Sequence, residues 1–331
     1  MAADSGGAVK RNEKRLLVFA LAGGALAFSS ETLVAQTIQA AEAMFLKGDY
    51  PACLEACADN TPVKADFSAF AALEVRTLLE TGKYQEAVAR GMVWWRRSQF
   101  NPELALEFAE ALRASGQPAQ ARTVVRQALQ MQPDPPTAGQ SRSTVAFGEL
   151  FLTEQADAKE VLKRIFEPAK KADPAGRAAY LALGRLALAH HDRELAAENF
   201  REGLMRFPGD PEFLLGLAQA GVALSKDLQK PADGISSYLD LALQANPKFT
   251  AALLAKAEKH GGSNDFKGTK QALDQVLAVN PNYQDAWAQV AALALLVDDT
   301  EGQGSYTRET TIHKNLTPCT PYLVGKVFTD A

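Results

Sequence analysis

The stretch "YLALGRLALAHHDRELAAENFREGLMRFP", from Tyr180 to Pro208, decides the fold. Its apolar residues recur at intervals of three and four, the spacing that places side chains on one face of a helix. A charged turn at His190 and His191 separates two such helices. Pro208 ends the second helix, because proline lacks the backbone N–H and disfavours the helical conformation in the residue before it. The stretch therefore predicts a helical hairpin with a sharp end.

The same hairpin recurs along the chain. Pro174 lies 34 residues before Pro208, Pro247 lies 39 residues after it, and Pro281 lies 34 residues further on. Three mostly small or apolar residues stand twelve, eight and five positions before each proline: Leu162, Phe166 and Ala169; Ala196, Phe200 and Gly203; Ile235, Leu239 and Ala242; and Thr269, Leu273 and Val276. A period of this length predicts stacked helical repeats that share one elongated core.

These residues resemble the tetratricopeptide repeat (TPR) pattern, W-x2-L-G-x2-Y…A-x3-F…P over about 34 residues. The best unit matches at Tyr180, Leu183, Gly184, Ala187, Ala196, Phe200 and Pro208. Partial matches include Gly48-Asp49-Tyr50 and Gly82-Lys83-Tyr84. The joints between units are marked by Asn101-Pro102, Phe207-Pro208, Asn246-Pro247 and Asn280-Pro281. The resemblance implies an all-α fold, a right-handed α-solenoid of about eight helix-turn-helix repeats over residues 36–316. Residues 317–331 would form the front helix of an incomplete further repeat or a closing helix.

Three segments depart from the repeat pattern. The segment from Met131 to Thr144 is rich in Pro, Gly, Ser and Thr, and this composition disfavours a helix. An insertion at Ser225–Asp233 interrupts the unit that ends at Pro247, and the second helix of the eighth unit, Glu301–Asn315, is degenerate. We expect bends or locally weak stacking at these places.

The start of the chain differs from the rest. A basic segment, Val9–Arg15, precedes an uncharged apolar run, Leu16–Phe28. This run is shorter than the ~18 residues of a spanning helix. It fits a secretory signal sequence with cleavage after Ala27 or Ala35, and a noncleaved anchoring helix is the alternative. We therefore expect residues 1–35 to be a signal sequence or N-terminal anchor of an exported bacterial protein, periplasmic or secreted, with membrane contact only through this segment if it is uncleaved.

Charge and motifs restrict the function. A net charge of -4 and a sequence pI near 5.7 provide no general positive field, so we do not expect a nucleic-acid partner. The segment Gly261–Lys270 lacks the spacing of a phosphate-binding loop and is interpreted as a turn between helices. His190 and His191 have no acidic or cysteine partner at ligand spacing and are expected in a solvated turn. We predict no catalytic, cofactor-binding or metal-binding residues, and no enzyme.

Two pairs of residues in the first units are interpreted as packing residues. Cys53 and Cys57 occupy small core positions, and we expect buried thiols rather than a disulfide, because an i, i+4 bridge would strain the helix. Of the adjacent Trp94 and Trp95, we expect one in the core and the other partly exposed on the convex side.

If the units stack as in the TPR family, the front helices line a concave groove. Front-helix residues off the packing stripe would point into it, and we interpret eight as partner-binding residues: Arg76, Glu110, Arg113, Leu181, Arg185, Gln219, Glu258 and Asp285. Family members that clamp a terminal carboxylate use a cluster of Lys, Arg and Asn, whereas the arginines here are spread over separate units. An extended or helical protein segment, held by aliphatic contacts and a few ion pairs, fits better.

The sequence therefore predicts a noncatalytic scaffold for protein–protein interaction, which binds a protein or peptide segment in its groove. The alternative is the docking region of a larger enzyme, such as a hydrolase, whose catalytic domain is absent from this chain. A coding region that continues past Ala331 with a catalytic motif would favour the alternative.

Overall fold

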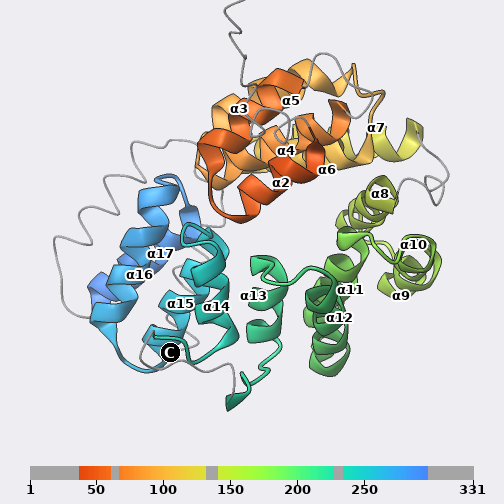
Figure 1. Cartoon of the computed structure of the whole chain (residues 1–331). Helices are drawn as coiled ribbons and strands as arrows, with labels where there is room; N and C mark the ends of the chain where they lie inside the picture. Colours follow the sequence, from red (N-terminus) through yellow and green to blue (C-terminus); the bar gives the residue numbers. More distant parts are fainter. Residues whose placement is uncertain (1–36, 61–66, 132–140, 227–233, 297–331) are drawn as a thin grey trace, which may run out of the picture.

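The computed structural model describes residues 37–60, 67–131, 141–226 and 234–296, and every regular element of these residues is a helix. Figure 1 shows their arrangement. In chain order the helices are α2 (Ile38–Leu46), α3 (Tyr50–Asn60), α4 (Phe67–Glu80), α5 (Tyr84–Trp95), α6 (Pro102–Ala114), α7 (Pro118–Met131), α8 (Ser141–Thr153), α9 (Ala158–Val161), the π-helix η2 (Leu162–Phe166), α10 (Glu167–Ala172), α11 (Arg177–Ala189), α12 (Arg193–Arg206), α13 (Pro211–Gln219), α14 (Tyr238–Ala245), α15 (Thr250–Gly262), α16 (Phe266–Val279) and α17 (Gln284–Leu296).

The helices pair into hairpins that stack in chain order. Each front helix packs on its own rear helix: α2 on α3, α4 on α5, α6 on α7, α8 on α9 to α10, α11 on α12, α13 on α14 and α15 on α16. Front helices also pack on one another, α2 on α4, α4 on α6, α6 on α8, α8 on α11 and α11 on α13. Helix α17 follows as the front helix of an eighth unit. This arrangement confirms the predicted all-α solenoid.

The best-matching unit shows why these residues form a hairpin. Gly184 on α11 faces the ring of Phe200 on α12, and a Cβ at this glycine would overlap the ring. The ring of Phe213 on α13 packs against Phe200 with centroids 6.5 Å apart. Both rings are fully buried, with at most 1% of their surface exposed. Because Gly184 has no side chain, the ring of Phe200 on α12 can pack closely on α11 and also contact Phe213 of the next repeat.

The rear helix that ends before Pro174 differs from the expectation. We expected Leu162, Phe166 and Ala169 on one buried face, but the π-helix η2 places Val161 in the core and leaves Leu162 only partly buried. Pro168 explains the difference, because its ring would collide with the carbonyl four residues earlier in a regular α-helix. The wider π-turn just before it removes this collision and shifts the buried positions by one residue at its start.

The two interruptions of the repeat are partly described. Helix α8 begins at Ser141, so the end of the segment expected to be nonhelical, Ser141–Thr144, is helical, and most of it is buried. The insertion shortens the next rear helix: α14 begins only at Tyr238, behind a capping box of Ser237 and Asp240. Ile235 lies before the helix yet is buried to 4% exposure, so it keeps its core position without helical structure.

The predicted packing residues are buried. Cys53 and Cys57 are buried thiols that form no disulfide, which confirms that interpretation. The expectation for the tryptophans is wrong, because Trp94 and Trp95 are both buried. The turn after α5 folds back over this end of the helix, and Phe100 packs edge-on against Trp95 with ring centroids 5.0 Å apart.

Several expectations fall on other parts of the chain. Residues 1–35, 317–331 and Glu301–Asn315 lie outside the described residues. Within the described part of the chain, no helix has both the length and the apolar character that a membrane span requires. The turn at His191 lies between α11 and α12, where the sequence predicted it. The expectation for Gly261–Lys270 holds only for Ser263–Asp265, because the ends of this segment belong to α15 and α16.

Candidate binding surface

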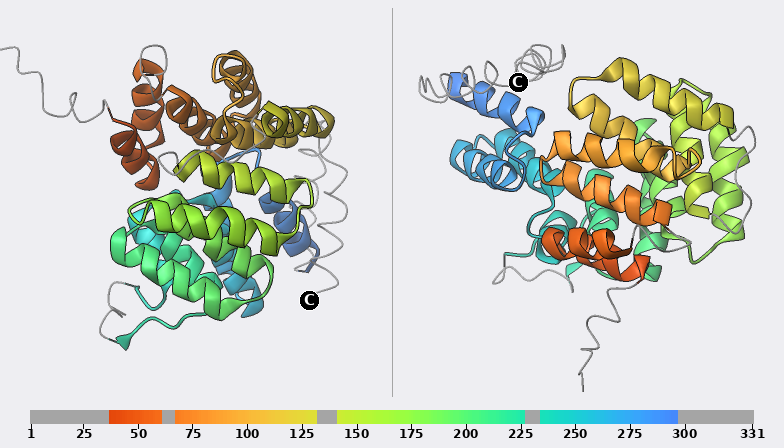
Figure 2. Two further views of the ribbon diagram at one scale, coloured as in Figure 1. Left: turned by 90° about the vertical axis from the view of Figure 1, so that its right-hand side faces the viewer. Right: turned by 90° about the horizontal axis from the view of Figure 1, so that it is seen from above.

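The two ends of the described solenoid lie against each other. Figures 1 and 2 show helices α2 to α5 beside α14 to α17. The Tyr50 hydroxyl donates a hydrogen bond to the carbonyl of Lys248 at 3.1 Å, across 198 residues of sequence. Asn246 Nδ2 donates to the same hydroxyl at 3.4 Å. The stack therefore curves far enough for its first repeats to contact its last ones.

A second contact of the same kind lies 34 residues further along both segments. The Tyr84 hydroxyl donates to the carbonyl of Asn282 at 3.3 Å, and Asn280 Nδ2 donates to the Tyr84 hydroxyl at 3.1 Å. We call the pairs Tyr50 with Asn246 and Tyr84 with Asn280 the two Tyr–Asn contacts. They join the turns inside the first two hairpins to the joints before α15 and α17.

Glycine is required in the turns that carry these tyrosines. Gly48 and Gly82 have φ angles of 78° and 74°, in the left-handed region that side chains with a Cβ rarely adopt. A Cβ at either position would also overlap the side-chain oxygen of the facing asparagine, Asn246 or Asn280. The Gly-x-Tyr turns therefore have both the conformation and the space that the Tyr–Asn contacts need.

Between the two Tyr–Asn contacts, Glu80 at the end of α4 caps the start of α15. One carboxylate oxygen of Glu80 accepts hydrogen bonds from the amide of Thr250 at 2.9 Å and from its hydroxyl at 2.7 Å. The residue before Thr250 is Phe249, which has no side chain able to cap the helix. A carboxylate is well suited to this position, because the N-terminus of a helix carries exposed N–H donors and a partial positive charge.

An ionic cluster joins the front helices α4, α11 and α13. Arg76 and Arg185 donate to one carboxylate oxygen of Glu212, at 2.6 and 2.7 Å. Arg177 binds the other oxygen of Glu212 and also Asp210, whose Oδ1 accepts at 2.9 Å. We call these five residues the arginine cluster. It brings together two predicted groove residues, Arg76 and Arg185, that 109 residues separate in sequence.

Burial and neighbouring charges shift the pKa values of the carboxyl groups in this region in opposite directions. Burial alone would raise the pKa of Glu212, but the three guanidinium groups outweigh it and hold its pKa well below the ordinary value. Burial raises the pKa of Glu107 on α6 to about 7, and the negative charge of Glu149 on α8 adds to this effect. Burial likewise raises the pKa of Glu149 and of Glu80. The region therefore contains a firmly ionised carboxylate beside carboxyl groups that protonate readily.

The remaining predicted groove residues are placed as follows. Glu110 and Arg113 pair with each other on α6 at 2.9 Å. Leu181 is buried to 5% exposure within the packing of α11, so it offers little surface to a ligand. Gln219, Glu258 and Asp285 are exposed on α13, α15 and α17. Burial raises the pKa of both Glu258 and Asp285.

Sequence reasoning missed Glu212, Arg177 and Asp210, which complete the arginine cluster, and it missed the Tyr–Asn contacts. Asp210 and Glu212 stand at the first turn of α13, where acidic residues are common for reasons local to any helix. The tyrosines and asparagines were visible as repeat residues. Their pairing was not, because it depends on how far the stack curves.

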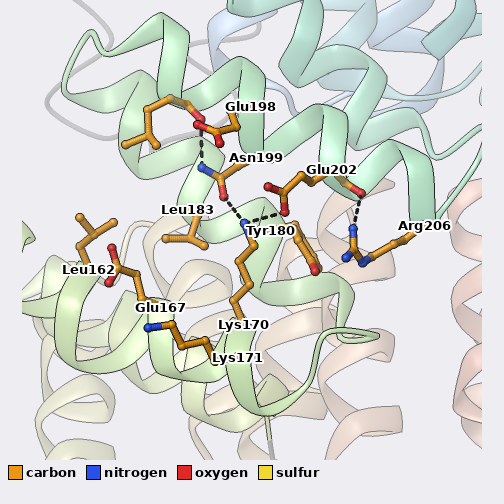
Figure 3. Close-up of a pocket in the computed structure, with 11 residues that line it drawn as sticks. Leu162, Glu167, Lys170, Lys171, Tyr180, Leu183, Glu198, Asn199, Glu202 and Arg206 are labelled. Atoms are coloured by element: carbon orange, nitrogen blue, oxygen red, sulfur yellow. Dashed lines mark hydrogen bonds and ion pairs between the residues drawn. The ribbon is translucent and has the colours of Figure 1, made fainter.

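A cavity of about 370 Å³ lies between α10, α11 and α12 (Figure 3). Its lining includes Tyr180, whose ring has the ammonium of Lys170 at 4.9 Å and the guanidinium of Arg206 at 5.0 Å from its centroid. Glu202 pairs with Lys170 at 2.8 Å. Equal numbers of acidic and basic residues line this cavity, so its charge favours neither anionic nor cationic ligands. Among the described residues, no group of His, Cys, Asp and Glu could hold a metal ion.

Comparisons with known proteins concern the fold. No family model matches the chain, and no curated protein sequence matches it. A chain of the APC/C hetero-tetramer Cut9–Hcn1 is similar in structure, with 14% identity and a TM-score of 0.51 over 87% of this chain and 55% of that one. The present chain therefore spans 55% of the length of that protein.

Two further solved structures are similar. The human IFIT1 dimer with PPP-AAAA has 14% identity and a TM-score of 0.50 over 90% of this chain and 74% of that one. TTC0263, a TPR protein of Thermus thermophilus, has 17% identity and a TM-score of 0.39 over 55% of this chain and 96% of that one. At these identities the likeness concerns the fold alone, the all-helical solenoid described above.

Proposed function

We propose that this chain is a noncatalytic scaffold that binds a protein segment along the inner face formed by its front helices. One observation carries the proposal. The residues Glu110, Gln219, Glu258 and Asp285 are exposed on the front helices of four different repeats. A ligand that contacts several of them must be long, which fits an extended or helical protein segment better than a small molecule.

The charges on these helices favour a segment with basic residues. Among the described residues, no ion pair reaches Glu107, Glu149, Glu258 or Asp285, whereas the three arginines of the cluster are already bound to carboxylates. Lysine and arginine side chains of a partner would complement the exposed carboxyl groups of Glu258 and Asp285, and these groups would repel the phosphates of a nucleic acid when they are ionised. We therefore propose a protein partner rather than a nucleic acid.

Site-specific photocrosslinking in the native cells tests the proposal. A photoreactive residue is placed at Gln219 or Glu258 on the inner face, and at Met205 on the rear helix α12 as a control, since this side chain is 72% exposed. We expect one protein to be captured from both inner positions and not from Met205. Equal capture from all three positions would contradict the assignment of the inner face.

Binding of the captured protein then tests the charge argument. We expect Glu258→Lys with Asp285→Lys to weaken binding by roughly tenfold or more, because like charges across an interface oppose association. The matched control is Glu160→Lys with Glu194→Lys, which changes exposed residues of the rear helices by the same charge. An unchanged Kd in the first variant, with intact helicity by circular dichroism, would refute a basic partner segment.

We also propose that the protein is exported, on the pattern of residues 1–35. The mass of the mature protein from the native cells tests this directly. Export by a cleaved signal predicts an N-terminus after Ala27 or Ala35. An intact N-terminus in a soluble cell fraction would argue against it.

A further inference from the structure

We propose that the contact between the first and last repeats is a closure that controls access of a protein partner to the inner face, which rests on the proposed function of that face. In the closed form, the two Tyr–Asn contacts, the Glu80 cap and the arginine cluster hold α4 against α13 and α15. In the open form, these polar contacts separate and the inner face is free for a long ligand.

The closure can open without unfolding either end, because each end has its own core. Phe45, Cys53 and Phe70 belong to one apolar cluster of the first repeats, and Leu253 and Leu273 belong to a separate cluster of the last repeats. Val279 is the apolar residue of the last repeats that packs on the first cluster within the described part of the chain. The Tyr–Asn contacts, the Glu80 cap and the Arg76–Glu212 pair are hydrogen bonds and an ion pair, which water can replace when the ends separate.

The contacts are arranged to form and break together. The two Tyr–Asn contacts use the same residue types at the same positions of neighbouring repeats, one period of 34 residues apart on both sides. Neighbouring hairpins pack on one another at each end, α2 and α3 on α4 at one end and α16 on α17 at the other. Rigid groups that meet at two such points approach or separate as units, which gives two discrete states rather than a gradual deformation.

Three Asn-Pro joints separate the local role of asparagine from its role in the closure. Asn101, Asn246 and Asn280 each accept a hydrogen bond from the amide two residues later, at 2.8, 2.9 and 3.1 Å. Asn246 and Asn280 also donate to the tyrosine hydroxyls of the first repeats. The side-chain Nδ2 of Asn101 instead donates to the hydroxyl of Ser143 on α8, at 3.4 Å. Asn101→Ala therefore removes the same local bond and leaves the closure intact.

The closed form restricts the inner face itself. Arg76 on α4 reaches Glu212 on α13 directly, so the front helices of the second and sixth hairpins face each other across the interior. Glu149 on α8, also a front-helix residue, is half-buried near this pair. A partner that contacts these helices binds the open form better, and the closed population then lowers its apparent affinity.

The first measurement tests whether the contacts hold the ends together. Spin labels at Glu55 on α3 and Lys270 on α16, two exposed positions, report the distance between the ends in a Cys319→Ser background. Labelled chain is diluted with unlabelled chain, so that only distances within one molecule are recorded. We expect one short distance in the parent and in Asn101→Ala. A second, longer distance is expected in Asn246→Ala with Asn280→Ala, and in Tyr50→Phe with Tyr84→Phe, which keeps the packing of the rings.

The second measurement tests access with a defined probe. A cysteine at Glu149 is modified with a polymer-linked maleimide, and the rate is divided by that for N-ethylmaleimide. Cys53 and Cys57 are buried and do not compete. We expect the ratio to rise by roughly threefold or more in both closure variants, because the modified state is reached from the open population. Asn101→Ala should leave the ratio unchanged.

The outcomes separate this proposal from the proposed function. An unchanged distance distribution in both closure variants overturns the closure as the force that joins the ends. A longer distance with an unchanged maleimide ratio overturns control of access. Neither measurement needs a partner, so both can succeed even if no protein is captured from Gln219, a result that would refute the proposed function alone.

Discussion

At the scale of single residues, the region around the arginine cluster holds carboxyl groups with opposite titration behaviour. Glu212 stays ionised because three guanidinium groups bind it, whereas the pKa of Glu107 rises to about 7 because burial is only partly offset by Arg76 and Arg185. The pKa of Glu107 in the folded protein lies above that in the unfolded chain. The folded protein therefore binds more protons between these values, and it loses stability as the pH rises through about 7.

Glu107→Gln tests this linkage. Glutamine resembles the protonated side chain, so we expect the variant to be more stable than the parent above pH 8, by about 1 to 3 kcal/mol. At pH 5, where Glu107 is already protonated when folded, most of the difference should disappear. Urea unfolding at both pH values measures it. Glu86→Gln changes an exposed carboxyl group and serves as the control; equal stabilisation in both variants would contradict a special role for burial at Glu107.

Gly184→Ala tests the close approach of α11 and α12. The new Cβ would overlap the ring of Phe200, which is buried and touches the next repeat, so we expect a loss of about 1 to 3 kcal/mol. Gly262→Ala is the matched control, because no atom lies within 4 Å of its added Cβ. That variant should be neutral or slightly stabilising. Thermal unfolding of both variants measures the effect. An unchanged stability of Gly184→Ala would mean that α11 and α12 can move apart without loss of stability.

At the scale of elements, α15 obtains its N-terminal cap from a helix 170 residues earlier. Glu80→Ala removes this cap, and we expect the amide of Thr250 to lose about 0.5 to 2 kcal/mol of protection. Hydrogen exchange monitored by NMR or mass spectrometry measures the change. Glu86→Ala, which removes an exposed acidic residue from the first turn of α5, should leave the start of α15 unaffected. Unaltered exchange at Thr250 in Glu80→Ala would show that water replaces the carboxylate without loss.

The helices themselves were predictable from the sequence, because spacing of three and four between apolar residues is a local signal. Many of their starts and ends followed from prolines and turns in the same way, whereas the starts of α8 at Ser141 and of α14 at Tyr238 did not. The π-helix at Leu162–Phe166 was not predicted, although the sequence contains Pro168 just after it. A proline inside an apolar ladder permits either an end to the helix or a wider turn, and only packing on α8 and α11 decides between them.

At the scale of the whole molecule, the stack spreads the effect of a core change over neighbouring repeats. Leu183 on α11 is buried to 4% exposure in a cluster with residues of α8 and η2. We expect Leu183→Asp to destabilise the protein by about 4 kcal/mol or more and to reduce helicity beyond its own hairpin, because an unpaired charge enters a shared core. Met205→Asp, at a side chain 72% exposed on α12, is the control. Melting of Leu183→Asp at the parent temperature would contradict a shared core.

The closure and the arginine cluster could not be read from the sequence, for a reason that belongs to this scale. The curvature of a solenoid is the sum of small rotations between successive repeats, and each rotation depends on side-chain packing. A repeat count and a list of groove positions follow from periodicity. Whether Arg76 meets Glu212, or Tyr50 meets Asn246, depends on the accumulated rotation over several hairpins, for which no short segment carries a signal.

The distance in sequence between Tyr50 and Lys248 has a consequence for biosynthesis. A ribosome delivers the chain from its amino end, so the hairpins of α2 to α5 can fold long before α15 and α16 emerge. The early hairpins then present their turns, and the carboxylate of Glu80, as a finished template for the late ones. Contacts so far apart along the chain form slowly. We therefore expect docking of the last repeats to be the final step of folding, observable as a slow phase in which the amide of Thr250 gains protection after the helices have formed.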